Sequence, residues 1–202
     1  MSEAIGIFGG TFDPPHLGHL ILAAESFEQL GLDRLLWVLT PIPPHKLEQA
    51  LTPLENRLDM TLLLLADYPH FELSRVEIDR PGPHYMLETI QLIKGQFPGS
   101  EFFLLMGGDS LMDLPNWYHP SELVSACEYL GVMRRPDNNV DLNALEKTIP
   151  GVTEKVRFVD APLLEISSRE IRKRISEGHA FKHFLTPLVY EYIRDNGLYL
   201  RR

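Results

Sequence analysis

The sequence predicts an α/β protein with a Rossmann-like, doubly wound, mainly parallel sheet and helices on both faces. Short apolar runs alternate along the chain with segments of helical spacing, and two of these runs end in glycine pairs, Gly9-Gly10 and Gly107-Gly108. This alternation is typical of parallel sheets whose two faces are covered by helices. Because no repeat, low-complexity tract or linker divides the chain, we expect residues 1–202 to form a single domain.

The predicted strands are short and apolar, as expected for strands buried on both faces. In order they are residues 4–8, 34–40, 101–106, 129–133 and 156–159, and residues 71–79 are also expected to be extended.

The predicted helices have apolar residues at spacings of three and four. They cover residues 17–30, 53–67, 85–96, 168–177 and 187–196. Gly31 and Gly197 follow the first and last of them, as is common at helix ends, and Pro53 suits a first helical turn. We expect a C-terminal helical part from about residue 167.

Composition and charge exclude several classes of protein. The 19 Lys and Arg against 28 Asp and Glu give a net charge of −9, which argues against general binding of nucleic acid or of anionic membranes. Cys127 is the only cysteine, so no internal disulfide can form, and the longest apolar run, residues 62–66, is too short to span a bilayer. No signal peptide is recognisable, and a cytoplasmic location is expected.

The charge is unevenly distributed along the chain. Residues 1–133 have 6 basic and 18 acidic side chains (net −12), whereas residues 134–202 have 13 and 10 (net +3). An acidic protein with one basic segment, residues 169–174, is expected to bind a small anion at one place.

The first motif is GGTFDPPHLGH, residues 9–19, at the end of the first predicted strand. Glycines let a phosphate or ribose approach the backbone, and a helix N-terminus attracts anions. His16 and His19 are three residues apart, so both rings can project from the same face of the first helical turn. We expect Gly18 to keep that face open for a ligand.

The motif has two other interpretations. It is also compatible with a Gly/Pro turn that contains two incidental histidines. A metal site is less convincing, because two histidines with no nearby third ligand do not complete one, and no metal site is predicted. The motif lacks the Gly-Lys-Ser/Thr of a Walker loop and the G-x-G-x-x-G of dinucleotide folds.

GGTFDPPHLGH resembles the signature of the HxGH nucleotidyltransferases. The resemblance implies that His16 and His19 contact the triphosphate of ATP and stabilise the pentacovalent transition state. It also places ATP near Gly9, Gly10, Thr11 and Phe12, and the mononucleotide near Thr11.

The second motif is ISSREIRKRI, residues 166–175. Ser167 or Ser168 can cap the helix, and Arg172, four residues after Ser168, lies on the same side. Hydroxyls and a guanidinium at a helix N-terminus can bind a phosphate, but by itself this pattern is equally compatible with an exposed, capped helix. It resembles the C-terminal motif of the nicotinate and nicotinamide mononucleotide adenylyltransferases, with Arg169 in place of the usual Thr. The resemblance places Ser167, Ser168 and Arg172 on ATP, with Arg172 taking part in catalysis.

Further segments match this family in the expected order. The resemblance puts Lys46 on the mononucleotide phosphate and Arg134 near ATP. It puts Gly107 and Asp109 at the ribose and adenine, with Asp109 facing both substrates, although Asp109 also suits a helix N-cap. Trp117 is expected to stack on the pyridine ring, while core packing is an equal alternative from the residues alone.

The segment GPHYMLET, residues 82–89, departs from the family pattern at His84 and Met86. The resemblance assigns Tyr85, Met86 and Tyr118 to the mononucleotide side. These departures weaken the prediction that the substrate is nicotinate mononucleotide, the acid, and not nicotinamide mononucleotide, the amide. They weaken the prediction of the reaction type less.

The implied reaction joins ATP and nicotinate mononucleotide to give deamido-NAD and pyrophosphate, with Mg²⁺ accompanying ATP. Three alternatives stay open at this point: a nicotinamide or dual-specificity enzyme, a pantetheine-phosphate adenylyltransferase, and a catalytically silent nucleotide sensor. The oligomeric state also stays open, a homo-oligomer included.

Overall fold

The computed structural model describes residues 2–43, 51–133, 140–162 and 164–201. Within these residues six strands form one sheet in the order β3-β2-β1-β4-β5-β6, and every neighbouring pair is parallel. This is the strand order of a Rossmann fold. The predicted fold class is therefore confirmed. The strands are β1 (Ala4–Gly10), β2 (Arg34–Leu39), β3 (Phe71–Ser74), β4 (Glu101–Gly107), β5 (Tyr129–Met133) and β6 (Val156–Val159).

The extended prediction for residues 71–79 is wrong beyond Ser74. The Asp79 amide donates to the Arg75 carbonyl oxygen at 2.9 Å, which closes a turn. The side chains of the same two residues form an ion pair at 2.7 Å. Local bonding at residues 75–79 thus replaces pairing with β2, whose register with β3 ends at Ser74.

The five predicted helices are present with shifts of one or two residues at their ends. They are α1 (Leu17–Gln29), α2 (Leu54–Leu65), α3 (Met86–Gln96), α8 (Ser168–Ser176) and α9 (Pro187–Asp195). Gly31 has φ +62°, a conformation that favours glycine after a helix end. Shorter helices were not predicted, because one or two turns are too short to display a helical period. They are α4 (Gly108–Asp113), α5 (Pro120–Ala126), α6 (Leu142–Thr148) and α7 (Val152–Lys155).

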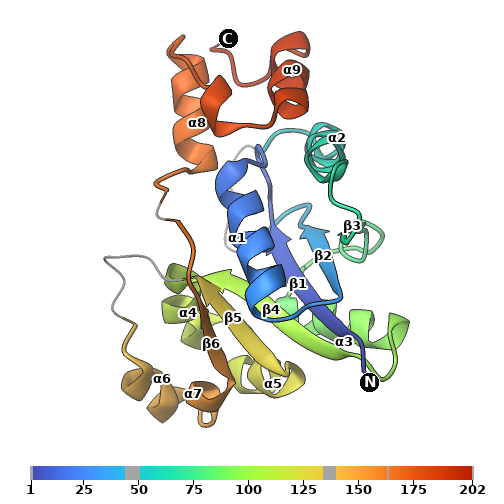
Figure 1. The fold of residues 1–202 in the computed structure, drawn as a ribbon, viewed down its shortest axis with the longest axis vertical. Coiled ribbons are helices and arrows are strands. Elements are labelled where there is room, and N and C mark those ends of the chain that lie inside the picture. Colours follow the sequence, from blue (N-terminus) through green and yellow to red (C-terminus); the bar gives the residue numbers. More distant parts are fainter. Residues whose placement is uncertain (1, 44–50, 134–139, 163, 202) are drawn as a thin grey trace.

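Alternate strand residues point to opposite faces of the sheet, so two apolar cores form. Ile7 and Val38 belong to the core under α3, α5, α6 and α7. Phe8 and Trp37 belong to the core under α1, α2, α8 and α9. Helices therefore cover both faces, as predicted (Figure 1).

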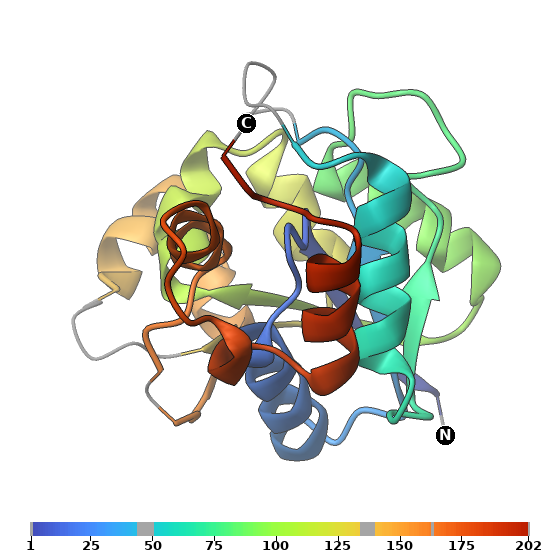
Figure 2. The same ribbon diagram turned by 90° about the horizontal axis from the view of Figure 1, so that it is seen from above.

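The strand order reverses between β1 and β4, which are neighbours in the sheet although other elements separate them in the chain. Such a switch point is where open α/β sheets bind ligands, beyond the carboxyl ends of the strands. Figure 1 shows α8 beyond the end of β1 and next to the start of α1. Figure 2 shows α9 lying beside α2 over the same end of the molecule. None of the described helices is long and apolar enough to cross a membrane.

Candidate active site

His16 and His19 lie together at the start of α1, where the first motif placed them. Their rings are stacked, with centroids 3.7 Å apart and an interplanar angle of 22°. His16 is the N-cap of α1, and the two residues form a reciprocal capping box. The His19 amide donates to His16 Nδ1 at 3.3 Å, and the His16 amide donates to His19 Nδ1 at 3.2 Å. The pair thus satisfies backbone groups that a helix start leaves without partners.

The capping box also assigns the protonation of both rings. Because each Nδ1 accepts a hydrogen bond from an N–H group, neither Nδ1 carries a proton. A neutral imidazole in this arrangement carries its proton on Nε2 and is a donor there. The local backbone therefore prepares two neutral Nε2–H donors at the carboxyl end of β1.

The surroundings of His19 keep its ring neutral. Burial holds the pKa of His19 well below its usual value, and the nearby His16 lowers it further. The Phe12 ring packs edge-on against the His19 ring, with ring centroids 5.2 Å apart. The Trp37 ring in turn contacts the Phe12 ring, with centroids 4.9 Å apart. The Phe12 side chain is 1% exposed, so it supports His19 from inside the core. The predicted contact of Phe12 with ATP stays a prediction.

The glycines of the motif make room for protein side chains. A Cβ at Gly9 would lie 2.7 Å from the Met86 Cε, and one at Gly10 would lie 2.8 Å from the Phe12 ring. A Cβ at Gly18 would lie 3.1 Å from two atoms of the His16 ring. A side chain at residue 18 would therefore crowd the His16 ring, and the expectation that Gly18 keeps the face open for a ligand stays a prediction. Met86 lies against Gly9 at the end of β1, and its predicted place on the mononucleotide side stays a prediction.

The second motif docks onto the first. Ser167 is the N-cap of α8 and accepts from the Glu170 amide at 3.2 Å. The Ser168 hydroxyl donates to the Pro14 carbonyl oxygen at 2.9 Å, and Arg172 Nη1 donates to the Asp13 carbonyl oxygen at 2.6 Å. Both bonds span more than 150 residues of sequence. The structure thus brings the predicted ATP residues of both motifs together.

The sequence did not single out three residues of this region, Arg57, Asp13 and Tyr199. Arg57 is 2% exposed and donates to the carbonyl oxygens of Thr11 (3.0 Å), Thr40 (2.8 Å), Pro41 (2.7 Å) and Thr52 (2.9 Å). Asp13 is 2% exposed, and its Oδ1 accepts from the Tyr199 hydroxyl at 2.7 Å. A signal existed for Arg57, because it shares the apolar face of α2 with Met60 and Leu64. The remote Tyr199 gave none.

The predicted mononucleotide residues of two separate segments also meet. The rings of Tyr85 and Tyr118 stack with centroids 4.2 Å apart. Tyr85 is the N-cap of α3, and Tyr118 is 43% exposed. Trp117 packs partly against the core, and its Nε1–H donates to Asp113 Oδ2 at 3.3 Å. Tyr85 and Tyr118 therefore form an aromatic wall next to Trp117.

The remaining predicted residues are placed as follows. Gly107 ends β4, and Asp109 lies exposed in the first turn of α4. The N-cap of α4 is Gly107, so the alternative role of Asp109 as an N-cap is wrong. Lys46 and Arg134 lie outside the described residues, and their predicted roles stay predictions.

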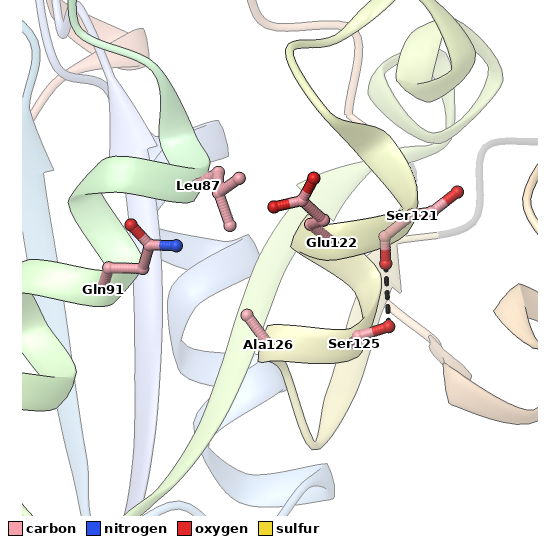
Figure 3. A pocket seen from close by; sticks show the side chains of 6 residues that line it. All are labelled: Leu87, Gln91, Ser121, Glu122, Ser125 and Ala126. Carbon is pink, nitrogen blue, oxygen red and sulfur yellow. Dashed lines mark hydrogen bonds between the residues drawn. The ribbon is translucent and has the colours of Figure 1, made fainter.

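A shallow, open surface hollow of about 450 Å³ lies elsewhere, between α3 and α5 (Figure 3). It is lined by Leu87, Gln91, Ser121, Glu122, Ser125 and Ala126. Its one charged lining residue, Glu122, would repel phosphate, and no predicted site residue lines it. In the described part of the chain, no group of three His, Cys, Asp or Glu residues could hold a metal ion.

Comparisons with known proteins agree with these observations. A sequence model of the cytidylyltransferase-like family matches residues 7–174. A protein of Thermomicrobium roseum named probable nicotinate-nucleotide adenylyltransferase is 41% identical over 96% of this chain and 91% of its own length. A Bacillus subtilis protein named nicotinate-nucleotide adenylyltransferase is 38% identical over 98% of each chain.

A solved structure has the same fold. It is the Plasmodium falciparum nicotinic acid mononucleotide adenylyltransferase complexed with NaAD, with a TM-score of 0.81 and 22% identity over 98% of this chain and 97% of the other. At this identity the likeness concerns the fold alone.

Proposed function

Because the chain belongs to the cytidylyltransferase-like family and, within it, to the nicotinate-nucleotide adenylyltransferases, we propose that it joins ATP and nicotinate mononucleotide. The products are deamido-NAD and pyrophosphate, a step in NAD biosynthesis. This is an adenylyl transfer without a covalent enzyme intermediate. A cytoplasmic location remains our prediction from the sequence.

The observation that carries this proposal is the junction of the two motifs. His16 and His19 supply neutral Nε2–H donors, while Arg172, anchored on the Asp13 carbonyl at 2.6 Å, supplies a positive charge beside them. Neutral donors and one guanidinium suit a site that receives a polyphosphate and a growing negative charge. Such a site needs no nucleophile of its own.

In the proposed reaction an oxygen of the mononucleotide phosphate attacks the α-phosphorus of ATP. A new P–O bond forms while the bond breaks between the α-phosphorus and the oxygen that bridges it to the β-phosphorus. Pyrophosphate leaves with the electron pair of the broken bond. His16, His19 and Arg172 act by stabilising the charge that builds up on these oxygens. Gly9, Gly10, Thr11, Ser167 and Ser168 position the nucleotide, so that alignment supplies the rest of the acceleration.

The mononucleotide is proposed to bind on the side of the aromatic wall. Tyr85, Met86, Trp117 and Tyr118 offer apolar and aromatic surface to the pyridine ring, and Asp109 accepts from ribose hydroxyls. Lys46 keeps its proposed role at the mononucleotide phosphate. Mg²⁺ is proposed to arrive on the ATP phosphates, because protein sites commonly hold this ion through substrate phosphates and few carboxylates.

The experiment that tests the function is a coupled pyrophosphate assay. ATP is offered with nicotinate mononucleotide, nicotinamide mononucleotide and pantetheine phosphate in parallel, at equal concentrations. We expect turnover with nicotinate mononucleotide to exceed the other two. Preference for either other substrate overturns the substrate assignment, and absence of pyrophosphate with all three supports a silent nucleotide sensor instead.

A further inference from the structure

We propose that Arg57, together with Asp13 and Tyr199, positions the turn that carries the two histidines. Arg57 touches no proposed substrate and acts through the backbone of residues 11–16. The inference rests on the proposed function for its kinetic consequence, but its structural consequence can be measured without any turnover.

The position of Arg57 at the centre of three segments is the first argument. Its guanidinium donates to Thr11 in the first motif, to Thr40 and Pro41 after β2, and to Thr52 before α2. A buried carbonyl oxygen needs a hydrogen-bond donor, and here one rigid, planar guanidinium donates to four carbonyl oxygens at once. The guanidinium therefore fixes where the first motif lies relative to the end of β2.

The charge balance around Arg57 is the second argument. A buried guanidinium is costly without a nearby anion, and the carboxylate of Asp13 acts on it electrostatically. That carboxylate accepts from the Thr52 amide at 3.3 Å and from the Tyr199 hydroxyl at 2.7 Å. The buried Arg57 and Asp13 and the half-buried phenol of Tyr199 thus form one cluster around the turn.

The chain of contacts from this cluster to the histidines is short. The Thr11 carbonyl is held by Arg57, the Asp13 carboxylate by Tyr199, and the Asp13 and Pro14 carbonyls by α8. His16 follows two residues after Pro14 and begins the capping box with His19. Because the capping box decides which nitrogen of each ring carries the proton, a displaced turn alters both the position and the tautomer of the donors.

Two substitutions test this proposal, each with a matched control. Arg57→Lys keeps the positive charge but lacks the planar guanidinium that donates in several directions. Tyr199→Phe removes the hydroxyl that donates to Asp13 Oδ1. Tyr192→Phe is the control for Tyr199→Phe, because the Tyr192 hydroxyl also donates to a carboxylate, Asp59 Oδ2 at 2.8 Å. This hydroxyl accepts from Asn56 Nδ2 at 3.1 Å, so both of its partners lie on α2 and not in residues 11–16. Leu64→Ala is the control for lost stability, because Leu64 is 2% exposed in the same helix as Arg57.

The first readout is the nitrogen NMR spectrum of the imidazoles in the folded, ligand-free proteins. We expect the wild type to show Nε2-protonated rings for His16 and His19, and both test variants to shift these signals. Tyr192→Phe and Leu64→Ala should leave them unchanged. The spectra decide the matter even if the wild type proves inactive, and Tyr199→Phe decides it if Arg57→Lys does not fold.

The second readout is the pyrophosphate assay on folded enzyme. We expect kcat to fall about 10- to 100-fold in Arg57→Lys with a smaller change in KM, because misplaced donors cost transition-state stabilisation most. Leu64→Ala should lose melting temperature but keep kcat. Wild-type imidazole signals in a folded test variant would overturn the inference. Wild-type kcat in a folded Arg57→Lys enzyme would do the same.

Discussion

Gly18→Ala separates the stability of helix α1 from the geometry of His16. The alanine Cβ would lie 3.1 Å from the His16 Cε1 and Nδ1 atoms, whereas ordinary contacts begin at 3.4 Å. The ring must therefore move by about 0.3 Å, the difference between these two distances. On the other side the Cβ meets the Ile166 Cβ at 3.4 Å, which limits the directions in which the helix can yield.

The two effects of this substitution have opposite signs. Alanine in place of glycine favours a helix by up to about 1 kcal/mol, and φ at Gly18 is not in the left-handed region. Unfolding should therefore not become easier. A misplacement of about 1 Å can cost about a hundredfold in rate, so a shift of a few tenths of an ångström should lower kcat about 3- to 10-fold.

Calorimetry and the pyrophosphate assay measure the two effects separately. Gly95→Ala is the matched control, because Gly95 lies in helix α3 and a Cβ there would meet nothing within 4 Å. We expect both variants to keep or raise the melting temperature and only Gly18→Ala to lose kcat. An unchanged kcat in Gly18→Ala would refute the argument that the fit of the His16 ring against Gly18 sets the donor geometry.

Three further outcomes are expected. His19→Ala should lower kcat at least about a hundredfold in a chain that still folds, since it removes one donor to the transition state and one half of the capping box; near-normal kcat would contradict the role of this ring. Because burial lowers the pKa of His19 in the folded state, the unfolded chain takes up its proton first as pH falls below the usual value of about 6.5. The free energy of unfolding should therefore decrease below that pH, and urea titrations should show a shallower decrease in His19→Asn. Trp117→Ala should mainly raise KM for the mononucleotide; an unchanged KM with a lower melting temperature would make Trp117 a core residue instead.

A test of the fold concerns Cys127. Burial raises the pKa of its thiol to about 12, so the reactive thiolate is scarce at neutral pH. We expect no labelling by a thiol reagent at pH 8 in the native protein and complete labelling in urea. Fast labelling of the native protein would show that the core between β4 and α5 opens readily.

Local patterns were sufficient for the elements that bury long apolar faces. The strands at β1, β4 and β5 and the helix α1 followed from apolar runs and helical spacing, and the glycine pairs marked the edge at which the ligand was expected. The fold of residues 75–79 and helices α4 to α7 did not follow, because short segments show no clear period. Their structure is decided by contacts with the rest of the chain.

The two histidines and the two motifs were likewise visible in the sequence, because spacing alone puts His16 and His19 on one helical turn. Their protonation was not visible, since it depends on which nitrogen receives the backbone amide of the other residue. The close approach of the His16 ring to Gly18 was not visible for the same reason. Only the folded backbone shows that its missing side chain makes room for a ring of the protein.

The sequence by itself determined the parallel sheet, its ligand-binding edge and the chemical nature of the two motifs, because periodicity and residue type act locally. The tertiary structure alone decided that Arg57, Asp13 and Tyr199 meet around one turn. Their hydrogen bonds join residues up to 186 positions apart, and such bonds form only where the packing of α2 and the C-terminal segment removes water from the groups they join.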